Sequence, residues 1–142
     1  MDLFAGTGAL GLEALSRGAA RALFVDDNSE AVRLIQENIR LCGVEDRARV
    51  IHGAVDRVLR RFVKENRGGF TVVFLDPPYG QGYVEKTLKL LFQITDLDTL
   101  VVAEHDTRED LPVKIGDWVL TQGRRYGDTT ISFFVRDNPQ LM

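Results

Sequence analysis

Four consecutive residues, Asp76, Pro77, Pro78 and Tyr79, could hold a planar amine. They follow the apolar run 70–75, whose β-branched and aromatic content predicts a buried strand. Because proline lacks an N–H donor, the Asp76 carboxylate and the Pro77 carbonyl remain as acceptors, while the Tyr79 ring can stack. Ligands of open α/β sheets bind at the carboxyl ends of strands, so the tetrapeptide predicts an active-site wall. The alternative is a plain turn in which proline ends the strand.

A glycine-rich segment is the second motif that could do chemistry. Gly6, Gly8 and Gly11 have the spacing G-x-G-x-x-G, and Asp26 follows Gly6 by twenty residues. Glycine lets the backbone approach a ligand, and a carboxylate at a strand end can accept hydrogen bonds from a ribose diol. The pattern predicts an adenosine-containing cofactor, and it fits both a nicotinamide dinucleotide and S-adenosylmethionine.

Asp2 favours S-adenosylmethionine. Its carboxylate precedes Gly6 by four residues. A negative group there suits an ammonium and a sulfonium better than a pyrophosphate, because like charges repel in a partly desolvated cleft. The alternative is a structural role, in which Asp2 accepts hydrogen bonds from N–H groups of the glycine loop.

Length and composition narrow the function further. The 142 residues, 44% of them hydrophobic, predict one domain over residues 1–142 with a full core. Cys42 is the single cysteine, and His52 and His105 belong to no cluster with metal-ligand spacing, so we expect a reducing, cytoplasmic setting and no metal. No apolar run approaches the length of a membrane span.

The net charge of −3 argues against a protein that coats nucleic acid without selectivity, since such binding depends on Lys and Arg. Basic residues nevertheless gather within residues 57–67 and at Arg124 and Arg125. Clusters of this kind are most often a solvated helix face, so they permit RNA binding without requiring it.

The elements that must position these residues alternate along the chain. The predicted strands are 2–4, 22–26, 49–52, 70–75, 100–104, 113–122 and 130–135, and the predicted helices are 9–17, 29–42, 55–66 and 84–94. We expect Ser29 or Asn28 to cap the second helix, and Trp118, Phe133 and Phe134 to lie in the core. The order predicts an α/β fold: a mostly parallel seven-stranded sheet, helices on both faces, and a C-terminal antiparallel hairpin joined through residues 123–128.

Taken together, the motifs resemble those of amino-methyltransferases. Residues 2–8 fit the pattern D/E-x-F-x-G-x-G for S-adenosylmethionine, and residues 76–79 fit D/N-P-P-Y/F/W for a target nitrogen. The segments Val-Ala-Glu-His at 102–105 and Arg-Tyr-Gly-Asp-Thr at 125–129 are similar to the RsmD family, bacterial 16S ribosomal RNA guanine-N2 methyltransferases. The resemblance extends over essentially the whole chain and implies the Rossmann-like class I methyltransferase fold.

The resemblance also implies a cofactor, S-adenosyl-L-methionine, and the residues of its site. The catalytic candidates are Asp76, Pro77, Pro78 and Tyr79. The cofactor-binding candidates are Asp2, Phe4, Gly6, Thr7, Gly8, Asp26, Asp27, Asn28, Ala54 and Val55. Relatives often carry an acidic residue near the adenine after the third strand; here we expect backbone and apolar contacts of Ala54 and Val55, with Asp56 a weaker candidate.

The implied substrate is the exocyclic N2 amine of a guanine in 16S ribosomal RNA, within a small ribosomal subunit or an assembly intermediate. We expect a monomer or weak dimer with no membrane partner. The family carries a basic N-terminal extension, and the short first strand leads us to expect that this segment is missing here. Tyr83 could shape the rim of the site, residues 80–82 could form a mobile lid, and Glu104 could face the site or form a surface salt bridge.

There are four alternatives. A protein-glutamine methyltransferase is disfavoured, because such relatives typically have Asn where this chain has Asp76. Three others remain open at this point. An adenine-N6 methyltransferase acting on DNA or RNA would use the same Asp-Pro-Pro-Tyr chemistry, although the chain lacks an obvious target-recognition insert. A nicotinamide-dependent oxidoreductase would use the glycine loop, but no catalytic His, Lys or Tyr set is evident. A non-catalytic module could keep only the cofactor pocket.

Overall fold

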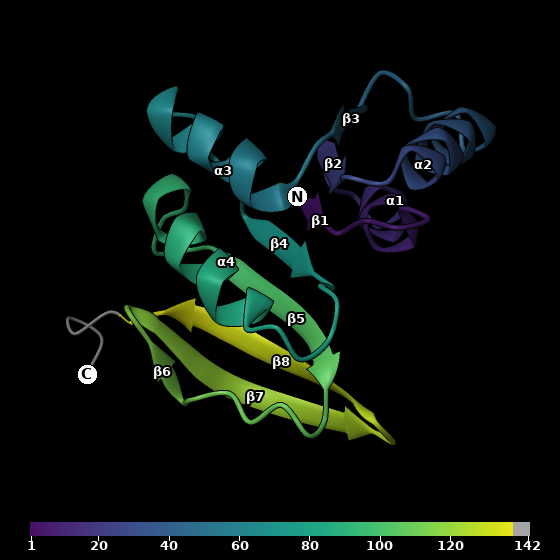
Figure 1. Ribbon diagram of the computed structural model, residues 1–142. Helices are drawn as coiled ribbons and strands as arrows, with labels where there is room; N and C mark the ends of the chain where they lie inside the picture. Colours follow the sequence, from purple (N-terminus) through teal and green to yellow (C-terminus); the bar gives the residue numbers. More distant parts are fainter. Residues whose placement is uncertain (138–142) are drawn as a thin grey trace. The chain divides into compact units, whose positions relative to one another are not determined.

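The computed structural model describes residues 1–137 (Figure 1). These residues belong to two compact units, Met1–Val58 and a second unit that begins at Leu59. Each unit has its own strands. The single domain expected over residues 1–142 stays a prediction. Within the described residues, no helix is both long enough and apolar enough to cross a membrane.

The first unit is built on three parallel strands. They are β1 (Asp2–Leu3), β2 (Ala22–Asp26) and β3 (Ala48–His52), with β2 in the middle. Helix α1 (Ala9–Ser16) connects β1 to β2, α2 (Ser29–Leu41) connects β2 to β3, and α3 (Val55–Lys64) begins after β3. Because the pairs are parallel, the loops that follow β1, β2 and β3 start from the same edge of this unit.

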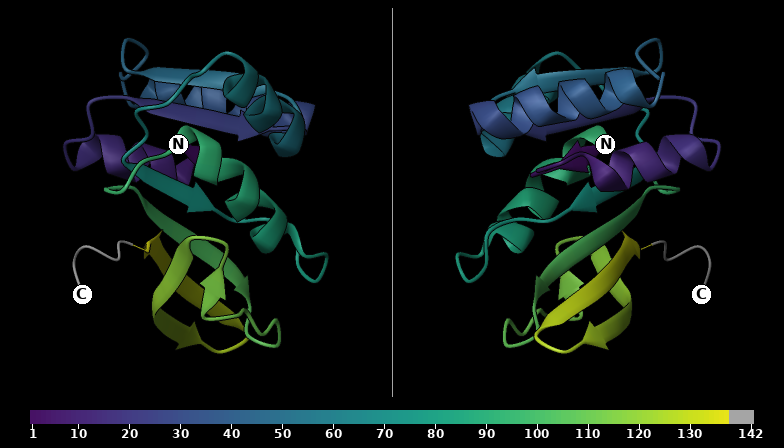
Figure 2. Two further views of the ribbon diagram at one scale, coloured as in Figure 1. Left: turned by 90° about the vertical axis from the view of Figure 1, so that its left-hand side faces the viewer. Right: turned by 90° about the vertical axis from the view of Figure 1, so that its right-hand side faces the viewer.

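Helices α1 and α2 pack on one face of β2. Buried Leu15 of α1, Phe24 of β2, and Ile35 and Ile39 of α2 form one cluster. Figure 2 shows α2 lying along β2 and β3. The apolar residues of α2 recur at helical spacing, which is why one face is buried and the other is polar.

The second unit combines one parallel pair with an antiparallel end. Its strands are β4 (Val72–Leu75), β5 (Leu100–Asp106), β6 (Lys114–Ile115), β7 (Trp118–Tyr126) and β8 (Thr129–Arg136), in the order β4-β5-β8-β7-β6. Helix α4 (Tyr83–Leu91) and a 3₁₀ turn (Phe92–Ile94) lie between β4 and β5 in the chain. Strands β4 and β5 are parallel, and the remaining pairs are antiparallel. Parallel strands followed by a C-terminal antiparallel hairpin confirm the predicted α/β fold class.

Two of the three predicted core aromatics are buried. Trp118 is 1% exposed, and its Nε1–H donates to the Leu88 carbonyl at 2.9 Å. Phe134 is fully buried, whereas Phe133 is only half-buried and lies 5.8 Å from the Arg124 guanidinium. The prediction for Phe133 is wrong because successive strand residues point to opposite faces, and only one of the two can face the core.

The C-terminal hairpin is longer than predicted. Strand β7 continues to Tyr126 and β8 begins at Thr129, so the connection is only Gly127 and Asp128 rather than residues 123–128. Gly127 has a φ of 63°, the positive value that a two-residue hairpin turn with glycine at its first central position requires. The predicted strand 113–122 is divided into β6 and β7 around Gly116, which also has a positive φ, and the described residues therefore contain eight strands rather than seven.

Candidate active site

The glycine loop between β1 and α1 has its shape fixed by left-handed backbone. Gly6 and Gly8 have φ values of 61° and 80°, which glycine adopts without steric cost. A Cβ added at Gly6 would meet no atom within 4 Å, so this stretch of backbone is open to the approach of a ligand. The side-chain amide of Asn38 in α2 donates to the Thr7 carbonyl at 3.0 Å and anchors the loop. Sequence analysis had missed Asn38, because nothing in its spacing links it to the loop.

Asp26 joins the end of β2 to the glycine loop. Its Oδ2 accepts the Gly6 N–H at 2.9 Å, and its Oδ1 accepts the Asn28 N–H at 2.9 Å. The residue is half-buried. Since each carboxylate oxygen has two lone pairs, both oxygens can accept a further hydrogen bond from a hydroxyl group. Asp26 thus shapes the loop and also fits the predicted contact with a ribose diol.

Asp2 is 2% exposed, and its Oδ2 accepts the Gly11 N–H at 3.0 Å in the first turn of α1. A carboxylate at this end of a helix is stabilised by the unpaired N–H groups and the helix dipole. The structural role that the sequence left open for Asp2 is therefore present. Its predicted contact with a cofactor ammonium stays a prediction.

The other cofactor candidates surround the same edge of the first unit. Phe4 has a φ of 59°, which is uncommon for an aromatic residue and typical of strained positions near functional sites. His52 Nε2 lies 2.9 Å from the Asp27 carbonyl and holds the loop after β2 against the end of β3. Thr7, Asp27 and Asn28 are exposed, Ala54 is half-buried and Val55 is buried.

Asn28 is the N-cap of α2, where its Oδ1 accepts the Ala31 N–H at 3.0 Å. This confirms one of the two predicted caps. Because the Asn28 side chain already holds the helix start, any contact that it makes with a cofactor would have to be shared with the cap or made by its backbone.

In the second unit, residues 76–79 follow β4 directly. Pro77 is buried, while Asp76 and Pro78 are exposed and Tyr79 is 47% exposed. The Tyr79 ring is therefore available for stacking rather than part of the core. Leu75 pairs with Ala103 of β5, so the next residue along each strand, Asp76 and Glu104, are neighbours at the carboxyl end of this parallel pair.

Burial of its side chain and, to a smaller extent, the negative charge of Glu104 raise the pKa of Asp76 to about 6. Part of the Asp76 side chain contacts solvent, but neighbouring protein atoms still displace some of the water around its carboxyl group. Both effects disfavour the ionised form. A perturbed carboxyl group beside an exposed ring is typical of a functional site.

The raised pKa predicts an unusual pH dependence of stability. The folded protein holds the Asp76 proton more tightly than the unfolded chain, so this group lowers the free energy of unfolding as pH rises from about 4 to about 6. Asp76→Asn removes this titration, and we expect its stability relative to the wild type to increase across that range. Urea unfolding of both proteins at several pH values measures the difference, with Asp117→Asn as an exposed control. If the free energy of unfolding changed with pH equally in Asp76→Asn and in the wild type, the raised pKa of Asp76 would be contradicted.

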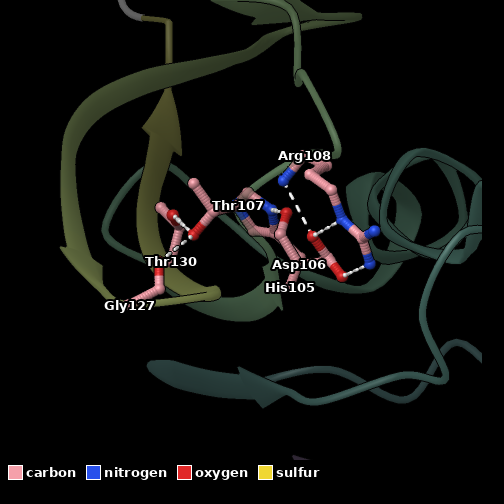
Figure 3. A network of polar contacts seen from close by, with 6 residues as sticks. All are labelled: His105, Asp106, Thr107, Arg108, Gly127 and Thr130. Carbon is pink, nitrogen blue, oxygen red and sulfur yellow. Dashed lines mark hydrogen bonds and ion pairs between the residues drawn. The ribbon is translucent and has the colours of Figure 1, made fainter.

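A network of polar contacts fixes the end of β5 against the β7–β8 turn (Figure 3). Buried His105 contacts Ser132 Oγ through Nε2 at 2.8 Å and the Asp106 carbonyl through Nδ1 at 2.9 Å. Thr107 Oγ1 lies 2.8 Å from Thr130 Oγ1 and donates to the Gly127 carbonyl at 3.1 Å. Sequence analysis missed this network; the signal was a pair of polar residues, His105 and Ser132, at inward positions of two apolar strands.

Asp106 ends β5, two residues beyond the predicted limit of that strand, and Arg108 clamps its carboxylate. Arg108 donates to both Asp106 oxygens, with its Nη2 2.8 Å from Oδ2 and its Nε 3.0 Å from Oδ1. These hydrogen bonds lower the pKa of Asp106 to about 2. The hydrogen bonds from Arg108 favour the ionised form of Asp106, whereas the surroundings of Asp76 disfavour its ionised form.

The basic residues predicted on the third helix are exposed, apart from the half-buried Arg67. Arg61 Nε lies 3.8 Å from Glu65 Oε1, and the Arg67 guanidinium lies 4.2 Å from the Phe62 ring centroid. Part of this cluster therefore has partners within the fold. In the part of the chain that the structure describes, no group of three or more His, Cys, Asp or Glu side chains could hold a metal ion.

Comparison with known proteins adds to this geometry. Residues 1–135 match the family described as "Conserved hypothetical protein 95". The chain is 37% identical to "Putative rRNA methyltransferase YlbH" of Bacillus subtilis, over 94% of this chain and 73% of that protein. It is 31% identical to "Ribosomal RNA small subunit methyltransferase D" of Escherichia coli, over 96% of this chain and 68% of that protein.

Solved structures show the same similarity in three dimensions. A conserved hypothetical protein of Streptococcus pyogenes superposes with a TM-score of 0.84 at 31% identity, over 95% of this chain and 84% of that one. An RNA methyltransferase of Salinibacter ruber, solved with S-adenosyl-L-homocysteine, has a TM-score of 0.69 at 20% identity, over 96% of this chain and 80% of that one. The second likeness shows the shared fold alone.

Proposed function

This chain belongs to the RsmD-like family of S-adenosylmethionine-dependent methyltransferases that its motifs predicted, and from that premise we propose that it methylates the exocyclic N2 amine of a guanine in 16S ribosomal RNA. The proposed partner is a small ribosomal subunit or an assembly intermediate, in the cytoplasm. The observation that carries the proposal is the segment after β4, where Asp76 and the Tyr79 ring, both partly open to solvent, lie on either side of the buried Pro77.

The first unit fits the family's cofactor, S-adenosyl-L-methionine. Asp26 would accept hydrogen bonds from the ribose hydroxyls, and the open backbone at Gly6 would allow close approach. Ala54 and Val55 would contact the adenine through backbone and apolar atoms. When bound, the cofactor supplies an electrophilic methyl group on its sulfonium.

Asp76 and Pro77 would prepare the target nitrogen. An exocyclic guanine amine is a poor nucleophile because its lone pair is conjugated with the ring. If the Asp76 carboxylate and the Pro77 carbonyl each accept one N–H, the nitrogen can become pyramidal and direct its lone pair at the methyl group. The same two acceptors stabilise the positive charge that develops on nitrogen in the transition state, which is where stabilisation accelerates a reaction.

Tyr79 would hold the base. An enzyme that modifies a base must expose it first, and a flipped base is commonly stacked against an aromatic side chain. Such stacking contributes about 1–3 kcal/mol per base. With the base fixed in this way, Asp76 and Pro77 meet the amine in a constant orientation, and orientation accounts for a large part of many rate enhancements.

The direct test is methylation of small ribosomal subunits that lack their guanine-N2 methyl groups. Purified protein and labelled S-adenosylmethionine are added, and the digested RNA is analysed by mass spectrometry. We expect N2-methylguanosine at a single position. Formation of N6-methyladenosine would instead support the adenine alternative, and labelling of neither base in subunits or naked RNA would refute the proposal.

The role of Asp26 gives a separate prediction. Asp26→Ala removes the ribose acceptor and also frees the Gly6 N–H, so we expect the Kd for S-adenosylhomocysteine to rise about 10- to 100-fold, the range for one or two hydrogen bonds to a charged group. Calorimetric titration measures this Kd, with Asp46→Ala, an exposed aspartate of the same unit outside the predicted site, as the control. Unchanged affinity would refute the assignment, and binding of NAD in place of S-adenosylhomocysteine would contradict the family's cofactor in this chain.

A further inference from the structure

Glu104 lies beside Asp76 at the carboxyl end of the β4–β5 pair. Along β5 the residues alternate, with Val101, Ala103 and His105 buried while Glu104 is half-buried on the other face. The Leu75 to Ala103 pairing brings Asp76 and Glu104 next to each other. Burial raises the pKa of Asp76, and the negative charge of Glu104 raises it further, as expected for neighbouring side chains.

Among the described residues, no cation forms an ion pair with Asp76 or Glu104. The acidic groups that form ion pairs in the second unit are Glu65, Asp106 and Asp137, and among residues 1–137 Glu104 has neither a hydrogen-bond partner nor an ion-pair partner. Without a cation nearby, the negative charge of Glu104 disfavours the ionised form of Asp76. The arrangement becomes favourable when N–H donors bind both groups, so it suits a ligand with two adjacent donors.

We propose that Glu104 accepts the N1–H of the target guanine while Asp76 accepts an N–H of its N2 amine. The inference rests on the proposed function and adds to it a residue that selects the base. Guanine carries its N1–H donor directly beside the N2 amine, whereas adenine has an acceptor, N1, beside its N6 amine. A carboxylate at this position attracts the guanine edge and repels the adenine edge, so Glu104 distinguishes two bases that Asp-Pro-Pro-Tyr alone would treat alike.

The loss of the N1–H hydrogen bond also sets the expected size of the preference for guanine over other bases. A site built to hydrogen-bond a substrate N–H rejects an analogue that lacks it, because the buried acceptor is left unpaired. 2-Aminopurine is the suitable analogue, since it keeps the N2 amine and has an acceptor at N1. We expect wild-type protein to favour guanine over 2-aminopurine by at least about 100-fold in kcat/KM.

The experiment uses small subunits reconstituted with 16S RNA that carries either guanine or 2-aminopurine at the mapped methylation position. In Glu104→Gln the side-chain amide can donate to N1 of 2-aminopurine, so we expect the guanine preference to fall about tenfold or more. The quantity compared between variant and wild type is the ratio of kcat/KM for guanine to kcat/KM for 2-aminopurine. Any difference in nucleophilicity between the two amines affects both ratios equally and therefore cancels. Glu104→Asp keeps the charge and should keep the preference even if its rate is lower, and Glu109→Gln is the matched control.

An unchanged preference in folded Glu104→Gln, with folding checked by S-adenosylhomocysteine affinity, would overturn the inference. If Glu104→Gln does not fold, loss of the preference in Glu104→Asp would overturn it instead. Failure of the wild type to methylate the guanine particle at all would refute the proposed function, so the two failures are distinguishable.

Discussion

Asp76→Ala is expected to lower kcat about 100- to 1000-fold, the usual effect of removing one group that stabilises charge in the transition state. The variant loses the acceptor for one amine N–H and the negative charge that faces the developing positive charge on nitrogen. Because Asp76 is proposed to contact the amine of the target base rather than the cofactor, the Kd for S-adenosylhomocysteine should change by less than about twofold. Single-turnover methylation and calorimetry measure the two quantities.

Two further variants sharpen this experiment. Asp76→Asn keeps a carbonyl acceptor and removes the charge, so its kcat should lie between those of the wild type and Asp76→Ala. Asp117→Ala removes an exposed aspartate elsewhere in the same unit and should behave as wild type. The catalytic role of Asp76 would be refuted by a variant that binds cofactor weakly but turns over normally once saturated.

Gly11→Ala is expected to destabilise the protein by about 1–3 kcal/mol, the usual cost of overpacking a core. A Cβ at Gly11 would lie 2.3 Å from Cε1 and 2.7 Å from Cζ of Phe24. Phe24 is fully buried in the cluster with Leu15 and Ile35, so its ring cannot move aside cheaply. The expected sign is opposite to that of helix propensity, which favours alanine over glycine by about 1 kcal/mol inside a helix.

Urea unfolding measures the Gly11→Ala effect. Gly123→Ala is the control, because a Cβ at Gly123 would meet its nearest atom at an ordinary 3.9 Å. Phe24→Leu shortens the ring side chain, so the double variant Gly11→Ala/Phe24→Leu should lose less stability than the sum of the two single changes. If Gly11→Ala proved more stable than the wild type, the close packing of α1 on β2 would be contradicted.

The sequence determined what depends on local pattern and chemistry. Alternation of apolar runs with amphipathic segments predicted the parallel strands and their helices, and the residues that follow strand ends predicted the glycine loop, Asp26 and the segment 76–79. The predicted ends of strands were less accurate where the preferences of individual residues disagreed with the strand pairing. Gly123 and two arginines resembled a loop, yet they continue β7 because pairing with β8 outweighs their weak strand preference.

Only the tertiary structure decided how side chains distant in sequence meet. Asp2 was predicted to face a cofactor, but its buried carboxylate also holds Gly11 nine residues later, which no spacing rule distinguishes from a ligand contact. The pairing of β4 with β5 sets Glu104 beside Asp76, and the pairing of β5 with β8 sets His105 against Ser132. Motifs identify the chemical groups that a site could use, whereas strand register decides which of those groups lie close together. The pKa of Asp76 depends on the groups that strand pairing places around it.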